Sequence, residues 1–273
     1  MTSSQEAMRV LEETSRTFYI PIAGLPDSLR EAVTSAYLCM RAIDEVEDHP
    51  SLDPSAKAQV LRSISSLLQA QHAVGALDHA GLAAALSSHR DQLPEVTLRI
   101  GEWASYAPES IAFRVWDGTA AMADRMAHWA ARGWRIETEA DLDRYTFGVA
   151  GAVGLLLSDL WAWHDGTRTN RTEAIGFGRG LQAVNILRNR PDDLARGRDF
   201  FPPQWSADEL HAYARRNLRL AEAYVTALPS GPINDFCKLP LALAWRTLTA
   251  LQEGQAKLSR TEVVQIMQGV GYR

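Results

Sequence analysis

Helical spacing of apolar residues runs through nearly the whole chain and limits its possible folds more than any other feature. Apolar side chains recur at intervals of three and four residues, as in two segments that contain Leu61, Ile64, Leu67 and Leu68, and Leu218, Ala221, Val225 and Leu228. The alternation of apolar and polar residues that is typical of strands is not apparent in the sequence. Prolines, glycines and helix-start signals divide the pattern into roughly ten to twelve helices.

Helix-start signals locate several of these helices. They comprise Asp53-Pro54, Ser206 with Glu209, and Ser259 with Glu262. Another helix is predicted from about Pro26 to Asp48. The chain has 273 residues, 46% of them apolar, and no linker or low-complexity tract interrupts it. A single all-α domain over residues 1–273, built around a central cavity, is therefore predicted.

Composition excludes several classes of protein. The net charge of −5 argues against nucleic-acid binding, and the two cysteines provide no disulfide framework, so a reducing cytosol fits. The first residues lack the basic start and apolar core of a signal peptide. The longest uncharged stretch, Tyr145 to Ser158, is shorter than the ~20 apolar residues of a membrane span and is predicted to be a buried helix.

The acidic segment from Asp44 to Asp48 ends one of the predicted helices. Its first and last carboxylates are four residues apart and project from one helix face, and Tyr37 and Arg41 continue the same stripe. Carboxylates beside an arginine suit a ligand that is both anionic and metal-bound, such as a diphosphate with Mg²⁺. The alternative is a solvated helix end with ordinary ion pairs.

A second polar stripe lies on a later helix. Its members, spaced by three, four and four residues, are Gln182, Asn185, Asn189 and Asp193. These side chains either line a ligand pocket that opposes the first stripe across the cavity or form a buried hydrogen-bond network between helices. Pro191 is expected to kink this helix, and the kink could turn Asp192 inward.

Small residues recur at steps of three or four on one face of the uncharged helix. They are Gly148, Gly151, Ala152 and Gly154. Such a face permits close contact with another helix or leaves room for a ligand. Tyr145, which precedes this face, is either a ring that stabilises a cation or a core aromatic residue.

These segments together resemble the squalene/phytoene synthase family of head-to-head prenyltransferases, in its bacterial squalene-synthase-like branch. The resemblance covers most of the chain in four blocks: Ser15 to Phe18, Tyr37 to Asp48, Tyr145 to Gly154, and Gln182 to Pro202 with its Gly-Arg-Asp-Phe-Phe-Pro ending. It implies an all-α isoprenoid synthase fold with a mostly apolar cavity between two acidic helices. It also implies binding of prenyl diphosphates with three Mg²⁺ ions.

The resemblance assigns roles to residues of this sequence. The metal-binding set is Asp44, Asp48, Asn185, Asn189 and Asp193. Diphosphate contacts are assigned to Ser15, Arg16, Thr17, Tyr37, Arg41 and Arg188, and Gln182 and Asn185 are expected to line the same pocket near diphosphate and metal. Residues expected to face the prenyl chains are Phe18, Tyr145, Val149, Ala150, Gly154, Leu157 and Gly178. Asp44, Asp48, Asn189, Asp193 and Tyr145 are the predicted catalytic residues.

The implied reaction condenses two farnesyl diphosphates, through presqualene diphosphate, to a C30 squalene-type product that can serve as a hopanoid or carotenoid precursor. Whether NADPH takes part is left open, because the sequence contains no separate nucleotide motif. We expect a cytoplasmic monomer or weak dimer that binds no nucleic acid and has at most peripheral contact with the inner face of the membrane.

One departure from the family pattern bears on this reaction. Family members usually have aspartate where this chain has Asn189, so the second stripe carries one negative charge fewer. The alternative function is therefore a prenyl-diphosphate phosphatase that releases farnesol when water captures the allylic cation. A third hypothesis is a catalytically silent assembly partner, which would predict loss of the acidic segments.

Overall fold

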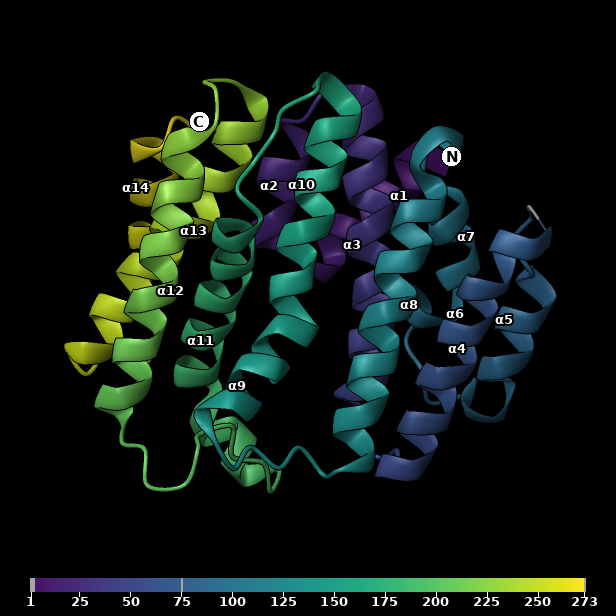
Figure 1. Ribbon diagram of the computed structural model, residues 1–273, viewed down its shortest axis with the longest axis horizontal. Coiled ribbons are helices and arrows are strands. Elements are labelled where there is room, and N and C mark those ends of the chain that lie inside the picture. Colours follow the sequence, from purple (N-terminus) through teal and green to yellow (C-terminus); the bar gives the residue numbers. More distant parts are fainter. Residues whose placement is uncertain (1–2, 75, 273) are drawn as a thin grey trace. The chain divides into compact units, whose positions relative to one another are not determined.

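The computed structural model describes residues 3–74 and 76–272, and every regular element within those ranges is a helix (Figure 1). The side chains of Arg16 and of residues 71–74 lie outside this description. The all-α fold class is confirmed. The chain divides into two compact units, Met1–Gly133 and Trp134–Arg273. The prediction of a single domain over residues 1–273 stays a prediction.

The helices of the first unit gather around α3 (Asp27–Glu47), which contacts α1, α2, α4, α6, α7 and α8. The other elements are α1 (Ser3–Thr14), α2 (Arg16–Ala23), α4 (Pro54–Val74), α5 (His79–Leu86), the 3₁₀ helix η1 (Ser87–His89), α6 (Glu95–Leu98), α7 (Ile100–Ser105) and α8 (Glu109–Ala131). The short helices α5, α6 and α7 make the observed elements more numerous than the roughly ten to twelve helices predicted by spacing.

The bounds of α3 agree with the sequence pattern. Pro26 occupies the position before the first helical residue, where its missing N–H costs nothing, and Asp48 follows the last. The middle of the helix is almost entirely buried, including Leu38 and Ile43. This burial fixes the rotation of α3 within the unit and hence the direction in which its polar stripe projects.

The second unit is built around α11 (Arg171–Ala195), which contacts α9, η2, α10, α12 and α13. Its other elements are α9 (Glu139–Thr146), η2 (Phe147–Gly151), α10 (Ala152–Asp165), α12 (Ala207–Ala227), α13 (Pro232–Gln252) and α14 (Arg260–Gly269). The predicted helix starts are confirmed, because Ser206 with Glu209 and Ser259 with Glu262 form reciprocal capping boxes.

A continuous helical run joins α9, η2 and α10 from Glu139 to Asp165, with a π-helical segment in the middle. Among the described residues it is the one helix long and apolar enough to cross a membrane, judged by length and composition only. It is longer than the uncharged stretch from which the sequence prediction was made. Leu156, Leu160 and Trp161 are buried in the second unit, as expected of a core helix.

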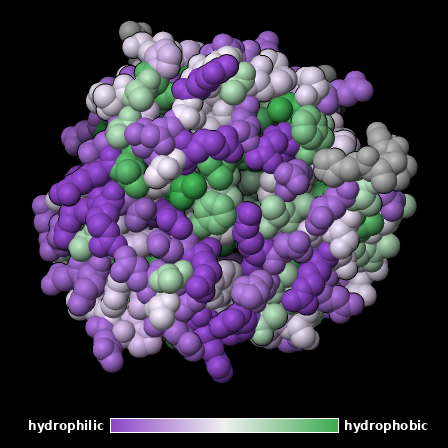
Figure 2. Space-filling model, viewed as in Figure 1, coloured by the Kyte–Doolittle hydropathy of each residue, from purple (hydrophilic) through white to green (hydrophobic). Residues whose placement is uncertain are grey.

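The surface of the described residues carries few large apolar side chains. The exposed ones are Phe113, Leu194, Leu220 and Val264, which belong to four different helices. Figure 2 shows one face of the molecule, on which hydrophilic residues predominate and hydrophobic ones occur in small groups. Isolated apolar residues of this kind are normal on soluble domains.

Candidate functional site: a carboxylate face on α3

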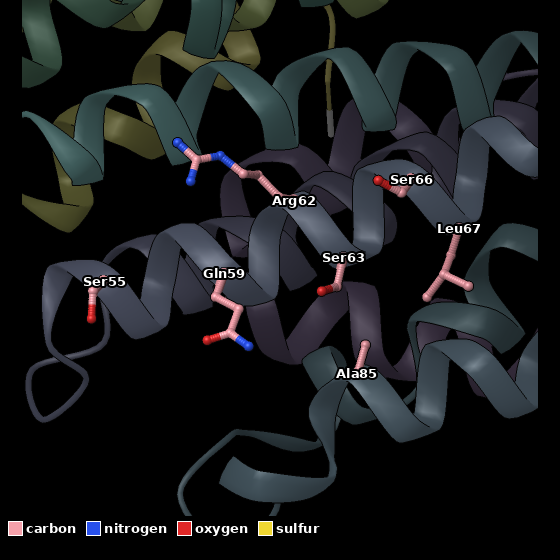
Figure 3. Close-up of a pocket in the computed structure, with 7 residues that line it drawn as sticks. All are labelled: Ser55, Gln59, Arg62, Ser63, Ser66, Leu67 and Ala85. Carbon is pink, nitrogen blue, oxygen red and sulfur yellow. The ribbon is translucent and has the colours of Figure 1, made fainter.

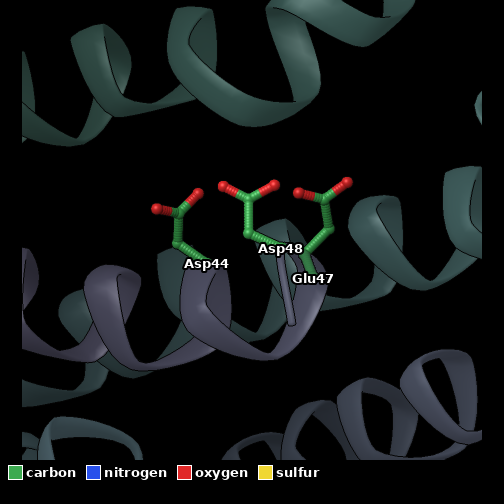
Figure 4. Close-up of side chains that lie close together, drawn as sticks. All are labelled: Asp44, Glu47 and Asp48. Atoms are coloured by element: carbon green, nitrogen blue, oxygen red, sulfur yellow. The ribbon is translucent and has the colours of Figure 1, made fainter. Parts of the chain in front are cut away.

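Three carboxylates project side by side from the last two turns of α3 (Figure 4). One oxygen from each of Asp44, Glu47 and Asp48 lies within 4.8 Å of the others. Within the described residues, this is the one group of three or more acidic, histidine or cysteine side chains close enough to share a cation. We name this group the carboxylate face.

Glu47 is the member that the sequence prediction missed. It lies three residues after Asp44, and this spacing places both on the same side of a helix. That signal was present in the sequence, but only the pair separated by four residues was singled out. Glu47 is buried, Asp44 is partly exposed and Asp48 is exposed, so the face runs from the interior of the unit to its surface.

Arg41 lies one turn before the carboxylate face. Its Nη1 donates to Asp44 Oδ2 at 2.7 Å, and its Nη2 pairs with Glu45. Its Nε is buried and has no hydrogen-bond partner among the described residues. Burial would lower the pKa of Arg41, but the charges of Asp44 and Glu45 outweigh it and raise that pKa. The guanidinium therefore stays charged, and its Nε–H is left without a partner in the described part of the chain.

Asp44 is the most perturbed carboxylate of the face. Burial, followed by the negative charge of Asp48, raises its pKa to about 7, although 33% of its side chain remains exposed. Arg41 opposes this shift but does not cancel it. Clustered carboxylates that raise one another's pKa are electrostatically suited to a divalent cation, which removes their mutual repulsion.

Asp44→Asn should therefore stabilise the metal-free protein at high pH. Between the ordinary pKa of 3.8 and about 7, the folded chain holds a proton on Asp44 that the unfolded chain has lost. The free energy of unfolding therefore falls as pH rises through this range. We expect the Tm of the variant in EDTA to exceed that of the wild type by about 3–6 °C at pH 8. The difference should shrink toward pH 4. An equal difference at both pH values would contradict the electrostatic cause.

The donor set fits magnesium. Carboxylate oxygens are the hard ligands that Mg²⁺ prefers, and this ion is commonly held by one or two carboxylates together with the phosphates of a substrate. Asp44, Glu47 and Asp48 are the residues of this unit that would hold it. The predicted roles of Asp44 and Asp48 as ligands are compatible with this geometry and stay predictions.

The residues predicted to contact diphosphate in α2 lie close to the polar stripe of α3. Ser15 caps α2 by accepting from Phe18 N at 3.1 Å, and its side chain also hydrogen-bonds with Tyr37. The rings of Phe18 and Tyr37 are 5.9 Å apart. Thr17 is exposed, and the side chain of Arg16 lies outside the described residues. The structure thus brings Ser15, Phe18 and Tyr37 together within the first unit.

The second polar stripe lies on α11, which continues through Pro191 to Ala195. Gln182, Asn185, Asn189 and Asp193 are all partly exposed. Asn189 Oδ1 accepts from Arg188 Nε at 3.1 Å, so the oxygen that would ligate a metal already has a cationic partner. Arg188 itself is exposed.

The structure does not turn Asp192 inward as the sequence had suggested. Asp192 is exposed, while its neighbour Asp193 is partly buried. Pro191 sits near the C-terminal end of α11, where the turn that follows is short and ends at Ala195. A proline at that position leaves too little helix beyond it to redirect a side chain toward the opposite face.

The segment after α11 is fastened to the second unit by aromatic and ionic contacts. Arg190 pairs with Asp199 at 2.9 Å and lies 3.7 Å from the centre of the Phe201 ring. Phe200 stacks on Tyr145, with ring centres 4.7 Å apart. Tyr145 is buried, which is compatible with a core aromatic residue, and its predicted role in stabilising a cation stays a prediction.

Glycines of the uncharged helix and of α11 serve close packing between these helices. A Cβ atom at Gly154 would lie 2.1 Å from the carbonyl oxygen of Ala174, and one at Gly178 would lie 2.1 Å from that of Ala150. The structure therefore supports the first of the two alternatives for this face. Val149, Ala150 and Leu157 are partly exposed, and their predicted contact with prenyl chains stays a prediction.

A polar groove of about 570 Å³ runs along α4 and α5 in the first unit (Figure 3). Its lining residues are Ser55, Gln59, Arg62, Ser63, Ser66, Leu67 and Ala85. Most of these side chains are exposed, and none belongs to the predicted site. The groove and the carboxylate face therefore share no residue.

Comparison with known sequences identifies relatives over most of the chain. The family model for squalene/phytoene synthase matches residues 11–212. The squalene synthase of Schizosaccharomyces pombe is 28% identical over 296 residues, covering 95% of this chain and 63% of the relative. That of Eremothecium gossypii is 29% identical over 294 residues, covering 93% and 63%. The chain thus spans less than two thirds of the length of these two relatives.

Solved structures share the fold at lower sequence identity. TcSQS in complex with the ligand BPH1237 aligns with a TM-score of 0.81 and 22% identity, over 100% of this chain and 87% of that one. A dehydrosqualene synthase in complex with a ligand aligns with a TM-score of 0.59 and 18% identity, over 98% and 95%. These likenesses concern the architecture of the backbone.

Proposed function

Because the chain belongs to the squalene/phytoene synthase family, we propose that it joins two prenyl diphosphates head to head in a Mg²⁺-dependent reaction. The observation that carries the proposal is the carboxylate face beside Arg41. Farnesyl diphosphate is the proposed substrate, presqualene diphosphate the intermediate and a C30 squalene-type compound the product. The retained carboxylates also argue against the hypothesis of a silent assembly partner.

In the first step, the bond between C1 of an allylic chain and the diphosphate oxygen breaks, and the bonding electrons leave with the diphosphate. Magnesium held by Asp44, Glu47 and Asp48 would offset the negative charge of this leaving group. Arg41 binds a phosphate oxygen through its guanidinium, whose charge is maintained by Asp44 and Glu45 and makes this hydrogen bond charge-assisted.

The same residues also orient the substrate. Tyr37 lies one turn before Arg41 on α3 and hydrogen-bonds with Ser15, so the two hydroxyl groups can bind phosphate oxygens that Arg41 leaves uncovered. The double bond of a second prenyl chain then attacks the resulting allylic cation to give a new tertiary cation. Loss of a proton, which the released diphosphate can accept, closes the ring of the cyclopropyl intermediate. Exclusion of water from the cation decides between this attack and release of farnesol.

The products of the purified protein test this proposal. The protein is incubated with farnesyl diphosphate and Mg²⁺, with and without NADPH, and extracted into hexane, while the aqueous phase is assayed for presqualene diphosphate. A C30 hydrocarbon, a C30 alcohol or presqualene diphosphate supports head-to-head condensation, and the NADPH arm shows whether a reductant is used. Farnesol as the sole product would overturn the synthase proposal.

A phosphatase is the second candidate function, and the contact between Arg188 and Asn189 favours it. Asn189 contributes no charge, and its oxygen already accepts a hydrogen bond from a guanidinium. Weak binding of Mg²⁺ and diphosphate by α11 would leave the second prenyl diphosphate poorly held. The first chain would still ionise at the carboxylate face, and water would capture its cation.

Asn189→Asp should restore the usual charge and change the reaction in a measurable way. We expect the Mg²⁺ concentration for half-maximal rate to fall by a factor on the order of 10, with a smaller share of farnesol among the products. Asn170→Asp is the matched control, because Asn170 caps the far end of the same helix and aspartate caps equally well. Unchanged metal dependence and products in Asn189→Asp would contradict the charge argument.

A further inference from the structure

A buried lysine reaches back from α4 to the turn that carries the carboxylate face. Lys57 is 2% exposed, and its Nζ donates to the backbone carbonyl oxygen of Glu47 at 2.6 Å. Glu47 is the last residue of α3 and is itself 4% exposed. Burial of an ammonium group costs free energy, so a favourable local interaction must compensate for it here.

The end of α3 does not close on a left-handed residue. Asp48, the capping residue, has φ −83° and ψ −6°, so the helix does not end in the left-handed glycine that commonly satisfies the last carbonyls. Those carbonyls carry partial negative charge, which a cation stabilises. Lys57 supplies both the hydrogen bond and the charge to the turn from which Glu47 and Asp48 project.

The carboxylates of this turn also repel one another. One oxygen from each of Asp44, Glu47 and Asp48 lies within 4.8 Å of the others, so like charges face one another at short range. Without a cation, this repulsion favours separation of the side chains or fraying of the last turn of α3. A buried cation bonded to the backbone of that turn opposes both changes.

We propose that Lys57 is a positioning residue for the carboxylate face: it holds the last turn of α3 so that Glu47 and Asp48 stay aligned with Asp44 for a divalent cation. The inference rests on the part of the proposed function in which this face binds metal. The bond of Lys57 Nζ to the backbone carbonyl oxygen of Glu47 is the contact through which it holds the turn.

Metal binding measured without substrate tests the proposal. Mn²⁺ serves as the probe, and its free concentration is followed by electron paramagnetic resonance with the full chain. We expect Lys57→Met, which keeps the length of the side chain and removes its charge, to weaken Mn²⁺ binding at least ~10-fold, as is typical when a partner behind the ligands is lost. With farnesyl diphosphate, the Mg²⁺ concentration for half-maximal rate should rise more than kcat falls.

Two further variants separate positioning from general stability. Ile64→Ala empties a fully buried site about two turns later on α4 and should lower Tm without changing Mn²⁺ affinity, when both are measured below the midpoint of unfolding. Equal weakening in Ile64→Ala and Lys57→Met would overturn the positioning role. Lys57→Gln decides the question if Lys57→Met does not fold: weakened Mn²⁺ binding supports the proposal, and wild-type binding overturns it.

Asp44→Asn distinguishes failure of this inference from failure of the proposed function. If Asp44→Asn abolishes Mn²⁺ binding while Lys57→Met binds as the wild type does, the carboxylate face stands and the role of Lys57 falls. If Asp44→Asn leaves Mn²⁺ binding intact, the metal site itself is wrong, and the positioning role falls with it.

Discussion

Asp44→Asn is expected to slow Mg²⁺-dependent release of diphosphate from farnesyl diphosphate by a factor on the order of 10²–10³. The substitution keeps the shape of the side chain and its bond to Arg41 but removes a charge from the carboxylate face. Because that charge is needed when diphosphate departs, the loss should fall mainly on kcat. A phosphate-release assay with coupled pyrophosphatase measures it across a range of Mg²⁺ concentrations.

Asp27→Asn is the matched control for this measurement. Asp27 begins the same helix, has an 89% exposed side chain and pairs only with Arg30 among the recorded ion pairs. Its replacement should leave the rate within about twofold of wild type, since surface ion pairs of this kind contribute little to stability. A normal rate in Asp44→Asn would remove the carboxylate face from the mechanism.

Gly178→Ala should strongly destabilise the protein. The added Cβ atom would lie 2.1 Å from the carbonyl oxygen of Ala150 and 2.8 Å from the Cα atom of Gly151, so backbone and not a flexible side chain must move. Overpacking of this kind costs about 3 kcal/mol or more, which corresponds to a fall in Tm of roughly 6–12 °C for a chain of this size. Thermal unfolding followed by circular dichroism measures it.

Gly269→Ala provides the opposite expectation for the same chemical change. Gly269 ends α14, and a Cβ atom there would meet nothing within 4 Å. Alanine is favoured over glycine in helices, so this variant should be neutral or gain up to about 1 kcal/mol. A small effect of Gly178→Ala, similar to that of Gly269→Ala, would show that η2 and α11 are not packed as closely as described.

Features set by local chemistry were predictable from the sequence. The capping boxes at Ser206 and Ser259 and the ends of α3 depend on residues within one turn of each other, so their signals are complete in a short window. The same reasoning located Asp44 and Asp48. It passed over Glu47 because a strict spacing of four hides a residue that lies at a spacing of three on the same face.

Features that depend on distant partners were not predictable in the same way. Periodicity showed that Gly154 and Gly178 lie on helix faces, but the carbonyl groups that they meet belong to other helices. The hydrogen bond between Arg188 and Asn189 depends on a choice of rotamer. The contact between Lys57 and the end of α3 spans a loop, and the sequence alone showed Lys57 only as one more charged residue near a helix start.

The π-helical segment from Phe147 to Gly151 rotates the side chains of α10 about the helix axis relative to those of α9. Tyr145 and Leu157 are twelve residues apart, a separation that on a regular α-helix turns them about 120° away from each other. A π-helical turn takes up about one extra residue, which reduces the angular offset to roughly 20°. The added residue therefore brings Tyr145 of α9 and Leu157 of α10 to nearly the same side of the helical run. A helical-wheel count for a regular α-helix would assign them to different faces.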